Sequence, residues 1–90
     1  MQSHVSDIVV SLAGRDAGET LLVLREEEDF LWLANGKHRR AERPKRKKRR
    51  HTAYAGACDE RTRQKLLEVG RLTNSDIRKA LALWAGENQN

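Results

Sequence analysis

A run of basic residues at positions 37–51, Lys-His-Arg-Arg-Ala-Glu-Arg-Pro-Lys-Arg-Lys-Lys-Arg-Arg-His, divides this 90-residue chain into parts of opposite charge. The run, here called the basic strip, holds ten of the eighteen Lys and Arg residues and one of the thirteen Asp and Glu residues, so its formal charge is +9, against −4 for the rest. Such a segment repels itself unless a polyanion neutralises it. Nucleic acid is the commonest cellular polyanion, so the strip predicts a nucleic-acid partner.

The size of the chain sets further limits. Ninety residues allow one domain, which buries only about 60% of the surface of its unfolded chain. A single cysteine, Cys58, excludes an internal disulfide framework and fits a reducing compartment. The N-terminal residues lack a secretory pattern, and no apolar run approaches the roughly 20 residues that cross a bilayer. We therefore expect a cytoplasmic protein with no membrane partner.

Three short apolar segments precede the basic strip and predict β-strands. They lie at residues 8–12, 21–24 and 30–33, and Gly, Asp or Glu residues bound each of them. The second and third segments do not alternate between apolar and polar residues, so both faces of these strands are apolar. Either closure of the sheet into a barrel or a packed helix must cover the second face.

The loops between these strands carry signals of their own. The dipeptide Asn35-Gly36 is typical of a two-residue hairpin, so the basic strip is expected to begin as a fourth strand. Pro44 has no backbone N–H to donate to a neighbouring strand, so it indicates a sheet edge or a bend. A fifth short strand is expected within residues 46–51. The loop 14–18, with a glycine at each end, is either a tight turn or a close approach of Arg15 to a phosphate.

The last third of the chain changes to a helical period. A first helix is expected over residues 59–69, with Gly70 as its stop. Thr73 and Asp76 predict the start of a second helix, which ends at Gly86. This helix carries one apolar stripe, formed by Ile77, Ala80, Leu81 and Trp84. The stripe must dock on the strands, so we expect an α+β fold, mainly β, in which two short C-terminal helices pack on the outside of a small barrel.

The basic strip has three interpretations. It binds RNA or DNA phosphates, it is a solvated tract or a localisation signal, or it binds anionic lipid or an acidic protein surface. The tie to a hairpin at Asn35-Gly36 favours display on a scaffold, near the loop that carries Arg15. The lack of large apolar residues disfavours an amphipathic membrane helix. Arg offers planar forks and Lys offers point charges to phosphates. The candidate RNA-binding residues are Arg15, Lys37, His38, Arg39, Arg40, Arg43, Lys45, Arg46, Lys47, Lys48, Arg49, Arg50 and His51.

Aromatic side chains offer a second device for RNA, because unpaired bases stack on them. Phe30 and Trp32 share a strand face, and we expect them in the core rather than in a stacking platform. Tyr54 follows the basic strip and is the alternative candidate for stacking. Trp84 belongs to the helical stripe and is expected to pack.

Residues with metal or catalytic chemistry form no recognisable pattern. His38, His51 and Cys58 lack the paired spacing of a metal site. Cys58 has Asp59 beside it but no base that would activate a nucleophile, and no Gly-rich nucleotide loop is present. We therefore expect no catalytic residues, no metal and no cofactor.

Several segments together resemble a known family. Residues 7–18, Asp-Ile-Val-Val-Ser-Leu-Ala-Gly-Arg-Asp-Ala-Gly, followed by Leu-Val-Leu at 22–24, resemble a KOW motif. With the segments 35–40, 44–48, 50–51 and 72–81, the chain resembles, over residues 5–84, the bacterial KOW-domain RNA-binding proteins related to large-subunit ribosomal protein fourteen of archaea and eukaryotes. The resemblance implies an SH3-like β-barrel at residues 5–54 that includes the basic strip, and a helical extension at 57–86. It also matches Gly18 to the glycine of the motif and places Arg15 in a loop that often touches RNA.

The resulting expectation is a non-catalytic RNA-binding protein associated with the ribosome, ribosomal RNA or another structured RNA. Six to ten phosphate contacts would lower the affinity by about 10³- to 10⁵-fold between low and moderately high salt. Reversal of Arg46, Lys47 and Lys48 to Glu is expected to abolish RNA retention without unfolding. One alternative is a protein-interaction module for an acidic partner in the transcription or translation machinery, such as polymerase. Another is a DNA-binding architectural protein, which the lack of a recognition-helix signature disfavours.

Overall fold

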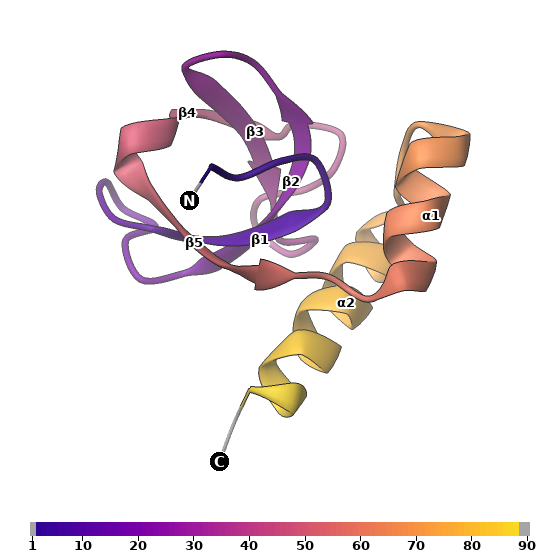
Figure 1. The fold of residues 1–90 in the computed structure, drawn as a ribbon. Helices are drawn as coiled ribbons and strands as arrows, with labels where there is room; N and C mark the ends of the chain where they lie inside the picture. The colour runs from indigo at the N-terminus through magenta and orange to yellow at the C-terminus, as the bar shows by residue number, and fades with distance from the viewer. Residues whose placement is uncertain (1, 89–90) are drawn as a thin grey trace.

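One antiparallel sheet and two helices form the protein in a computed structural model, which describes residues 2–88. The strands lie in the order β4-β3-β2-β1-β5, and the two helices lie together on one side of the curled sheet (Figure 1). The elements are β1 (Asp7–Ser11), β2 (Thr20–Glu26), β3 (Phe30–Ala34), β4 (Lys45–Lys48), the single 3-10 turn η1 (Arg49–His51), β5 (Thr52–Ala57), α1 (Glu60–Val69) and α2 (Asn74–Glu87). The predicted α+β fold with C-terminal helices is confirmed.

Both faces of the sheet are buried, which explains why β2 and β3 lack clean alternation. Successive side chains of a strand point to opposite faces. The face turned away from the helices buries Val9, Leu21, Val23, Leu31 and Leu33. On the other face, the helices bury a second cluster of Ile8, Leu22, Ala34, Cys58, Leu66, Leu72, Ile77 and Ala80. The expectation that a packed helix covers the outer face is therefore confirmed.

The helix ends follow the sequence signals closely. The Asp59 carboxylate accepts the Thr62 backbone N–H at 3.1 Å and caps α1, and Gly70 ends it with a φ of 88°. Thr73 and Asp76 form a reciprocal capping box at the start of α2. Helix α2 runs past Gly86 to Glu87, because glycine weakens a helix without ending it. No helix within residues 2–88 has the length and apolar character needed to cross a membrane.

The expected hairpin at Asn35-Gly36 is wrong. The Asn35 Oδ1 atom accepts backbone N–H groups of Lys37 and Arg39 at 2.9 and 3.1 Å, so the chain turns into a loop that lasts to Pro44. The fourth strand is β4, which starts directly after Pro44 and lies at the edge of the sheet, as that proline indicated. It overlaps the start of the strand expected within 46–51, and the rest of that range forms η1.

Strand β5 has no counterpart among the predicted elements. It pairs antiparallel with β1, and a register shift falls between Ile8 and Val9. Its residues are mostly small, and Trp84 packs against it at Gly56. A Cβ atom at Gly56 would lie 2.5 Å from the Trp84 Nε1 atom. The expectation that Trp84 serves packing is confirmed, and the sheet extends to Ala57.

Candidate nucleic-acid interface

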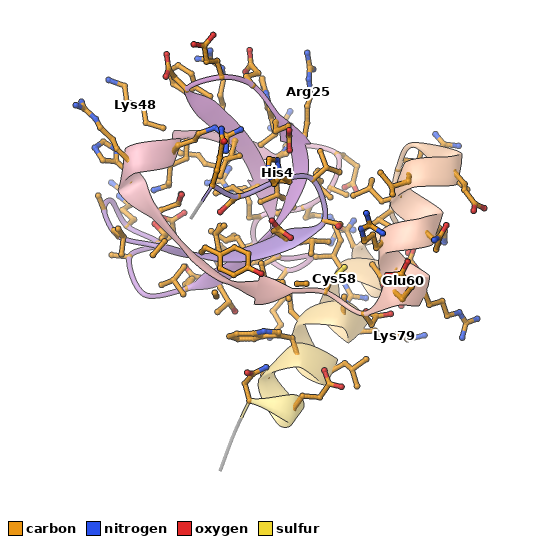
Figure 2. All side chains as sticks on the ribbon, in the orientation of Figure 1. His4, Arg25, Lys48, Cys58, Glu60 and Lys79 are labelled. Carbon is orange, nitrogen blue, oxygen red and sulfur yellow. The ribbon has the colours of Figure 1, made fainter. Side chains whose placement is uncertain are left out.

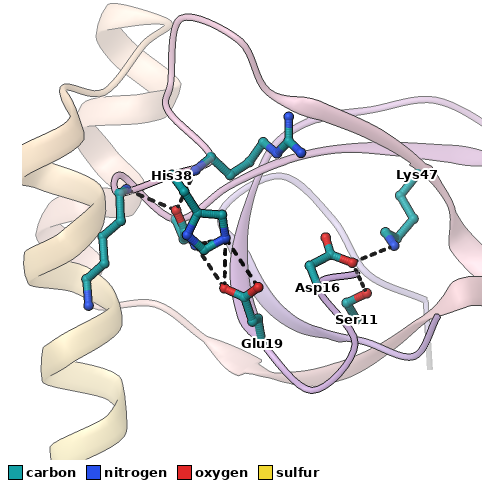
Figure 3. Close-up of polar contacts among 8 residues, drawn as sticks. Ser11, Asp16, Glu19, His38 and Lys47 are labelled. Atoms are coloured by element: carbon teal, nitrogen blue, oxygen red, sulfur yellow. Dashed lines mark hydrogen bonds and ion pairs between the residues drawn. The ribbon is translucent and has the colours of Figure 1, made fainter. Parts of the chain in front are cut away.

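The basic strip follows one edge of the sheet through the loop 35–44, β4 and η1, and it meets the β1–β2 loop there. The Lys47 Nζ atom lies 2.9 Å from the Asp16 Oδ1 atom of that loop, and His38 lies 3.1 Å from Glu19 (Figure 3). These contacts bring Arg15 next to the strip, although more than twenty residues separate Arg15 from Lys37 in the sequence. The structure therefore unites the two parts of the chain in which candidate residues were predicted.

A shallow groove lies where the strip and the β1–β2 loop meet. Its lining residues are Gly14, Arg15, Asp16, Glu19, His38, Arg39, Lys45 and Lys47. Burial raises the pKa of Asp16, but hydrogen bonds from Lys47 and Ser11 more than offset this effect and leave the pKa below its usual value. Asp16 is thus charged and paired with Lys47, while Arg15 and Lys45 are exposed at the groove.

Two cations of the strip hold the fold together. The buried Lys47 ammonium also donates to the Ala13 carbonyl at 2.7 Å, in addition to Asp16. The Arg49 guanidinium donates to the carbonyls of Ser3, Glu27 and Glu28 at distances of 2.6 to 3.0 Å. Both groups are therefore committed to the protein, and we leave Lys47 and Arg49 out of the proposed RNA contacts.

Three further candidates have an acidic neighbour at the surface. Arg40 forms an ion pair with Glu42 at 3.0 Å and Arg46 with Glu27 at 3.1 Å, and the His38 ring contacts Glu19 at hydrogen-bond distance. Hydrogen bonds from Arg46 and then Trp32 lower the pKa of Glu27, and hydrogen bonds from Arg40 and then Asn74 lower the pKa of Glu42. Exposed pairs of this kind contribute little to stability, so their cations can exchange the carboxylate for a phosphate.

The remaining candidates have no side-chain hydrogen bond or ion pair within residues 2–88. They are exposed to solvent, apart from the half-buried Arg39 and His51. Arg15 lies in the β1–β2 loop, and the others lie along the loop 35–44, β4 and η1. Lys48 reaches away from the sheet on the side opposite to Lys79 of α2 (Figure 2). The set consists of Arg15, Lys37, Arg39, Arg43, Lys45, Lys48, Arg50 and His51.

Helix α2 holds the loop that carries the first part of the strip. The Arg78 Nη1 atom donates to the Gly36 carbonyl at 2.6 Å, and the buried Asn74 accepts the Ala41 N–H at 2.7 Å and donates to Glu42. The helix passes so close that a Cβ atom at Gly36 would lie 2.5 Å from the Asn74 carbonyl. Sequence reasoning missed Asn74 and Arg78 as positioning residues, because a polar residue on a helix does not reveal its distant partner.

The aromatic pair on β3 is placed differently from the expectation. Phe30 and Trp32 are half-buried and belong to neither core cluster. The guanidinium carbon of Arg46 lies 3.5 Å from the Phe30 ring centroid, and that of Arg25 lies 5.4 Å from the Trp32 ring centroid. The Trp32 Nε1 atom donates to Glu27 at 2.9 Å. The assignment of both rings to the core is therefore wrong, because the outer face of β3 at this edge is covered by arginines rather than by a helix.

Cys58 lies among the apolar residues between the sheet and the helices (Figure 2). Burial, and secondarily the charge of Asp59, raises the pKa of its thiol to about 11. The thiol is therefore protonated at neutral pH and is a poor nucleophile. Within residues 2–88, no group of three His, Cys, Asp or Glu side chains is placed to hold a metal ion.

Comparison of the chain with protein-family models gave no match, and comparison with curated proteins gave none. The resemblance to KOW-domain proteins therefore stays a prediction. The candidate interface rests on its own geometry, which is a row of unpartnered cations along one edge of the sheet and around the β1–β2 loop.

Proposed function

We propose that this protein is a non-catalytic RNA-binding protein whose basic strip and β1–β2 loop contact the phosphates of folded RNA. The observation that carries the proposal is the row of exposed cations without protein partners, from Arg15 and Lys37 to Arg50. Three carboxylates beside the strip, on Asp16, Glu19 and Glu27, already face Lys47, His38 and Arg46. The free positive charge is therefore available to an external polyanion, and phosphates suit Lys and Arg groups well.

The finer description of the fold is also part of the proposal. An SH3-like barrel of the KOW type is supported by the strand order, by the 3-10 turn between β4 and β5, and by Gly18. The φ of Gly18 is 91°, a conformation that favours glycine, as expected of the glycine that the motif requires. In this description Arg15 lies in the loop that touches RNA in KOW domains.

Ribosomal RNA is the proposed target, on the strength of the same resemblance. The protein is expected to sediment with ribosomal particles at low salt and to leave them as salt is raised, because phosphate contacts are salt-sensitive. Sedimentation in a sucrose gradient, followed by detection of the protein in each fraction, tests this association. A protein that stays at the top of the gradient at every salt concentration would refute the ribosomal target and leave RNA binding open to the next test.

The RNA-binding test compares two variants with equal charge loss. The strip variant combines Lys37→Gln, Arg39→Gln and Lys45→Gln, and the control combines Arg61→Gln, Arg71→Gln and Lys79→Gln at exposed positions near the helices. Fluorescence anisotropy with a structured RNA, at several salt concentrations, gives the affinity and its salt slope. The strip variant should bind RNA more weakly. The slope of log affinity against log salt concentration should become shallower by about 0.9 for each phosphate contact removed. Equal losses in both variants would contradict a localised interface.

Reversal of Arg46, Lys47 and Lys48, the test that the sequence suggests, does not separate binding from folding. A glutamate at position 47 would face the Asp16 carboxylate at a buried position. The Arg46 reversal would also remove the cation from Glu27 and from the Phe30 ring. The strip variant avoids both problems because Lys37, Arg39 and Lys45 have no such partners within residues 2–88.

Two further assays distinguish RNA binding from the rival functions. Competition with duplex DNA at equal salt distinguishes an RNA-binding protein from an architectural DNA-binding protein. A protein partner captured by pull-down would survive nuclease treatment, whereas an RNA-bridged partner would be lost. Capture that resists nuclease and fails with the strip variant would favour the interaction module with an acidic partner.

A further inference from the structure

An open hollow at the end of β4 places an aromatic ring beside unpartnered cations. Its lining residues are Asp29, Phe30, Lys48, Arg49 and Arg50. Phe30 and Lys48 are directly opposed on β3 and β4, so their side chains project from the same face of the sheet. Lys48 and Arg50 are exposed and have no side-chain partner within residues 2–88, while Arg49 is occupied by backbone carbonyls. The hollow thus combines an apolar plane with two free charges.

The Phe30 ring is fixed without being fully buried. The Arg46 guanidinium stacks on the ring, and its Nε atom donates to the Glu27 carboxylate at 3.1 Å. Glu27 also accepts from Trp32, so the whole group is tied to β3 and to the turn before it. A ring that is already ordered loses little conformational freedom when another planar group stacks against it. This property suits a binding surface better than a mobile surface ring does.

We propose that this hollow binds one unpaired RNA nucleotide, with its base against Phe30 and its phosphate near Lys48 and Arg50. The inference rests on the proposed function and adds a contact to a base, where the basic strip alone contacts the backbone. The Asp29 carboxylate can only accept hydrogen bonds, so it repels a phosphate and suits the N–H groups on a base edge. A base within a continuous duplex cannot leave its stack cheaply, so the hollow selects RNA with bulges, loops or single-stranded ends.

The test uses two fluorescently labelled RNA hairpins that differ by one unpaired adenosine in the stem. Wild-type protein should bind the bulged hairpin about tenfold more tightly than the paired one, which is within the range of base–aromatic stacking. Phe30→Leu should remove most of this preference, and it should leave the affinity for the paired hairpin and the salt slope unchanged. Tyr54→Leu, which removes an exposed aromatic ring on β5, should leave the preference intact.

A second variant guards against a folding defect in Phe30→Leu. The pair Lys48→Gln and Arg50→Gln leaves the ring in place and should weaken binding of the bulged hairpin more than that of the paired hairpin. Equal wild-type affinity for both hairpins, a preference that survives Phe30→Leu, or equal weakening by the Lys48 and Arg50 changes would overturn the nucleotide site. Those results leave the proposed function standing, whereas failure of wild-type protein to bind either hairpin at low salt would overturn both.

Discussion

The Lys47 ammonium lies 2.9 Å from the Asp16 carboxylate, and both side chains are largely shielded, with 8% and 15% of their surfaces exposed. A cation in the middle of the basic strip therefore joins β4 to the β1–β2 loop. This pair keeps Arg15 and Lys45 at one groove, so it organises the candidate interface without taking part in it. The strip consequently contains residues that build the fold and residues that are free to bind.

Loss of the Lys47 charge should destabilise the protein. Lys47→Met keeps most of the side-chain volume but leaves the shielded Asp16 carboxylate without its cation. We expect the free energy of unfolding to fall by about 3 kcal/mol, measured by urea denaturation. Adding Asp16→Asn should recover part of the loss, because the unpaired charge is then gone. The exposed neighbour Lys45, changed to Met, should shift stability by no more than about 0.5 kcal/mol, and similar values for both single variants would refute the structural role of Lys47.

Arg49 and Arg50 are adjacent in sequence, but substitution of Arg49 should lower stability and substitution of Arg50 should lower RNA affinity. Arg49→Lys loses the planar fork that reaches three backbone carbonyls, so we expect a loss of about 1–2 kcal/mol in unfolding free energy. Arg50→Gln should leave the melting temperature unchanged and weaken RNA binding. Thermal denaturation and anisotropy titration of both variants provide the comparison. Destabilisation by Arg50→Gln as large as that by Arg49→Lys would contradict this division of roles.

The parts of the fold that could be predicted are those whose signals are local. Short apolar runs marked β1, β2 and β3, since each strand must bury its side chains. Thr73 and Gly70 marked helix ends because capping involves residues within one turn. The location of the basic strip beside Arg15 was also expected, although the hairpin invoked for it does not exist.

The missed features depend on partners far away in sequence. Asn35-Gly36 forms no hairpin because Asn74 and Arg78 of α2 hold the following loop. Strand β5 escaped notice because small residues give no apolar signal, and nothing in the sequence links Gly56 to the distant Trp84 that packs against it. Within a uniform basic run, nothing distinguishes Lys47 from Lys48 until the fold places a carboxylate beside one of them.

The capping box of α2 predicts a stability change in acid. Hydrogen bonds from Lys65 at 2.6 Å and then from the Thr73 backbone at 2.9 Å lower the pKa of Asp76 to about 2. Since the unfolded chain binds this proton more readily, the contribution of Asp76 is complete above about pH 4 and is lost as the pH falls toward about 2. Asp76→Asn should flatten the acid branch of a melting-temperature profile. Glu68→Gln, at an exposed site on α1, serves as the charge control, and an equal flattening there would count against the assignment.

Cys58 predicts that the protein loses stability in alkaline solution. Its thiol pKa of about 11 lies above the ordinary value of 9.0, so the unfolded chain releases this proton first and stability falls as the pH rises above about 9. At pH 8 only about one folded molecule in a thousand carries the thiolate, so alkylation by iodoacetamide should be slow until urea is added. Cys58→Ala should remove the alkaline component from the melting profile. Fast alkylation of the folded protein would show that the thiol is neither buried nor protonated.

Substitution of Asn74 should weaken RNA binding, although Asn74 is not among the proposed RNA contacts. Its side chain accepts the Ala41 N–H and donates to Glu42, and so fixes the loop that carries Lys37, Arg39 and Arg43. In Asn74→Ala this loop must be ordered during binding, so we expect affinity to fall roughly three- to tenfold. The salt slope should stay the same because no phosphate contact is lost.

Hydrogen exchange and titration together separate this effect from a lost contact. The Ala41 amide should exchange faster in Asn74→Ala, whereas Ser75→Ala, one residue further along α2, should alter neither exchange nor affinity. A lower salt slope in Asn74→Ala would mean that cations had left the RNA, and unchanged affinity with faster exchange would mean that loop order is irrelevant to binding. Only weaker binding at an unchanged slope agrees with α2 acting as the support that pre-organises the basic strip.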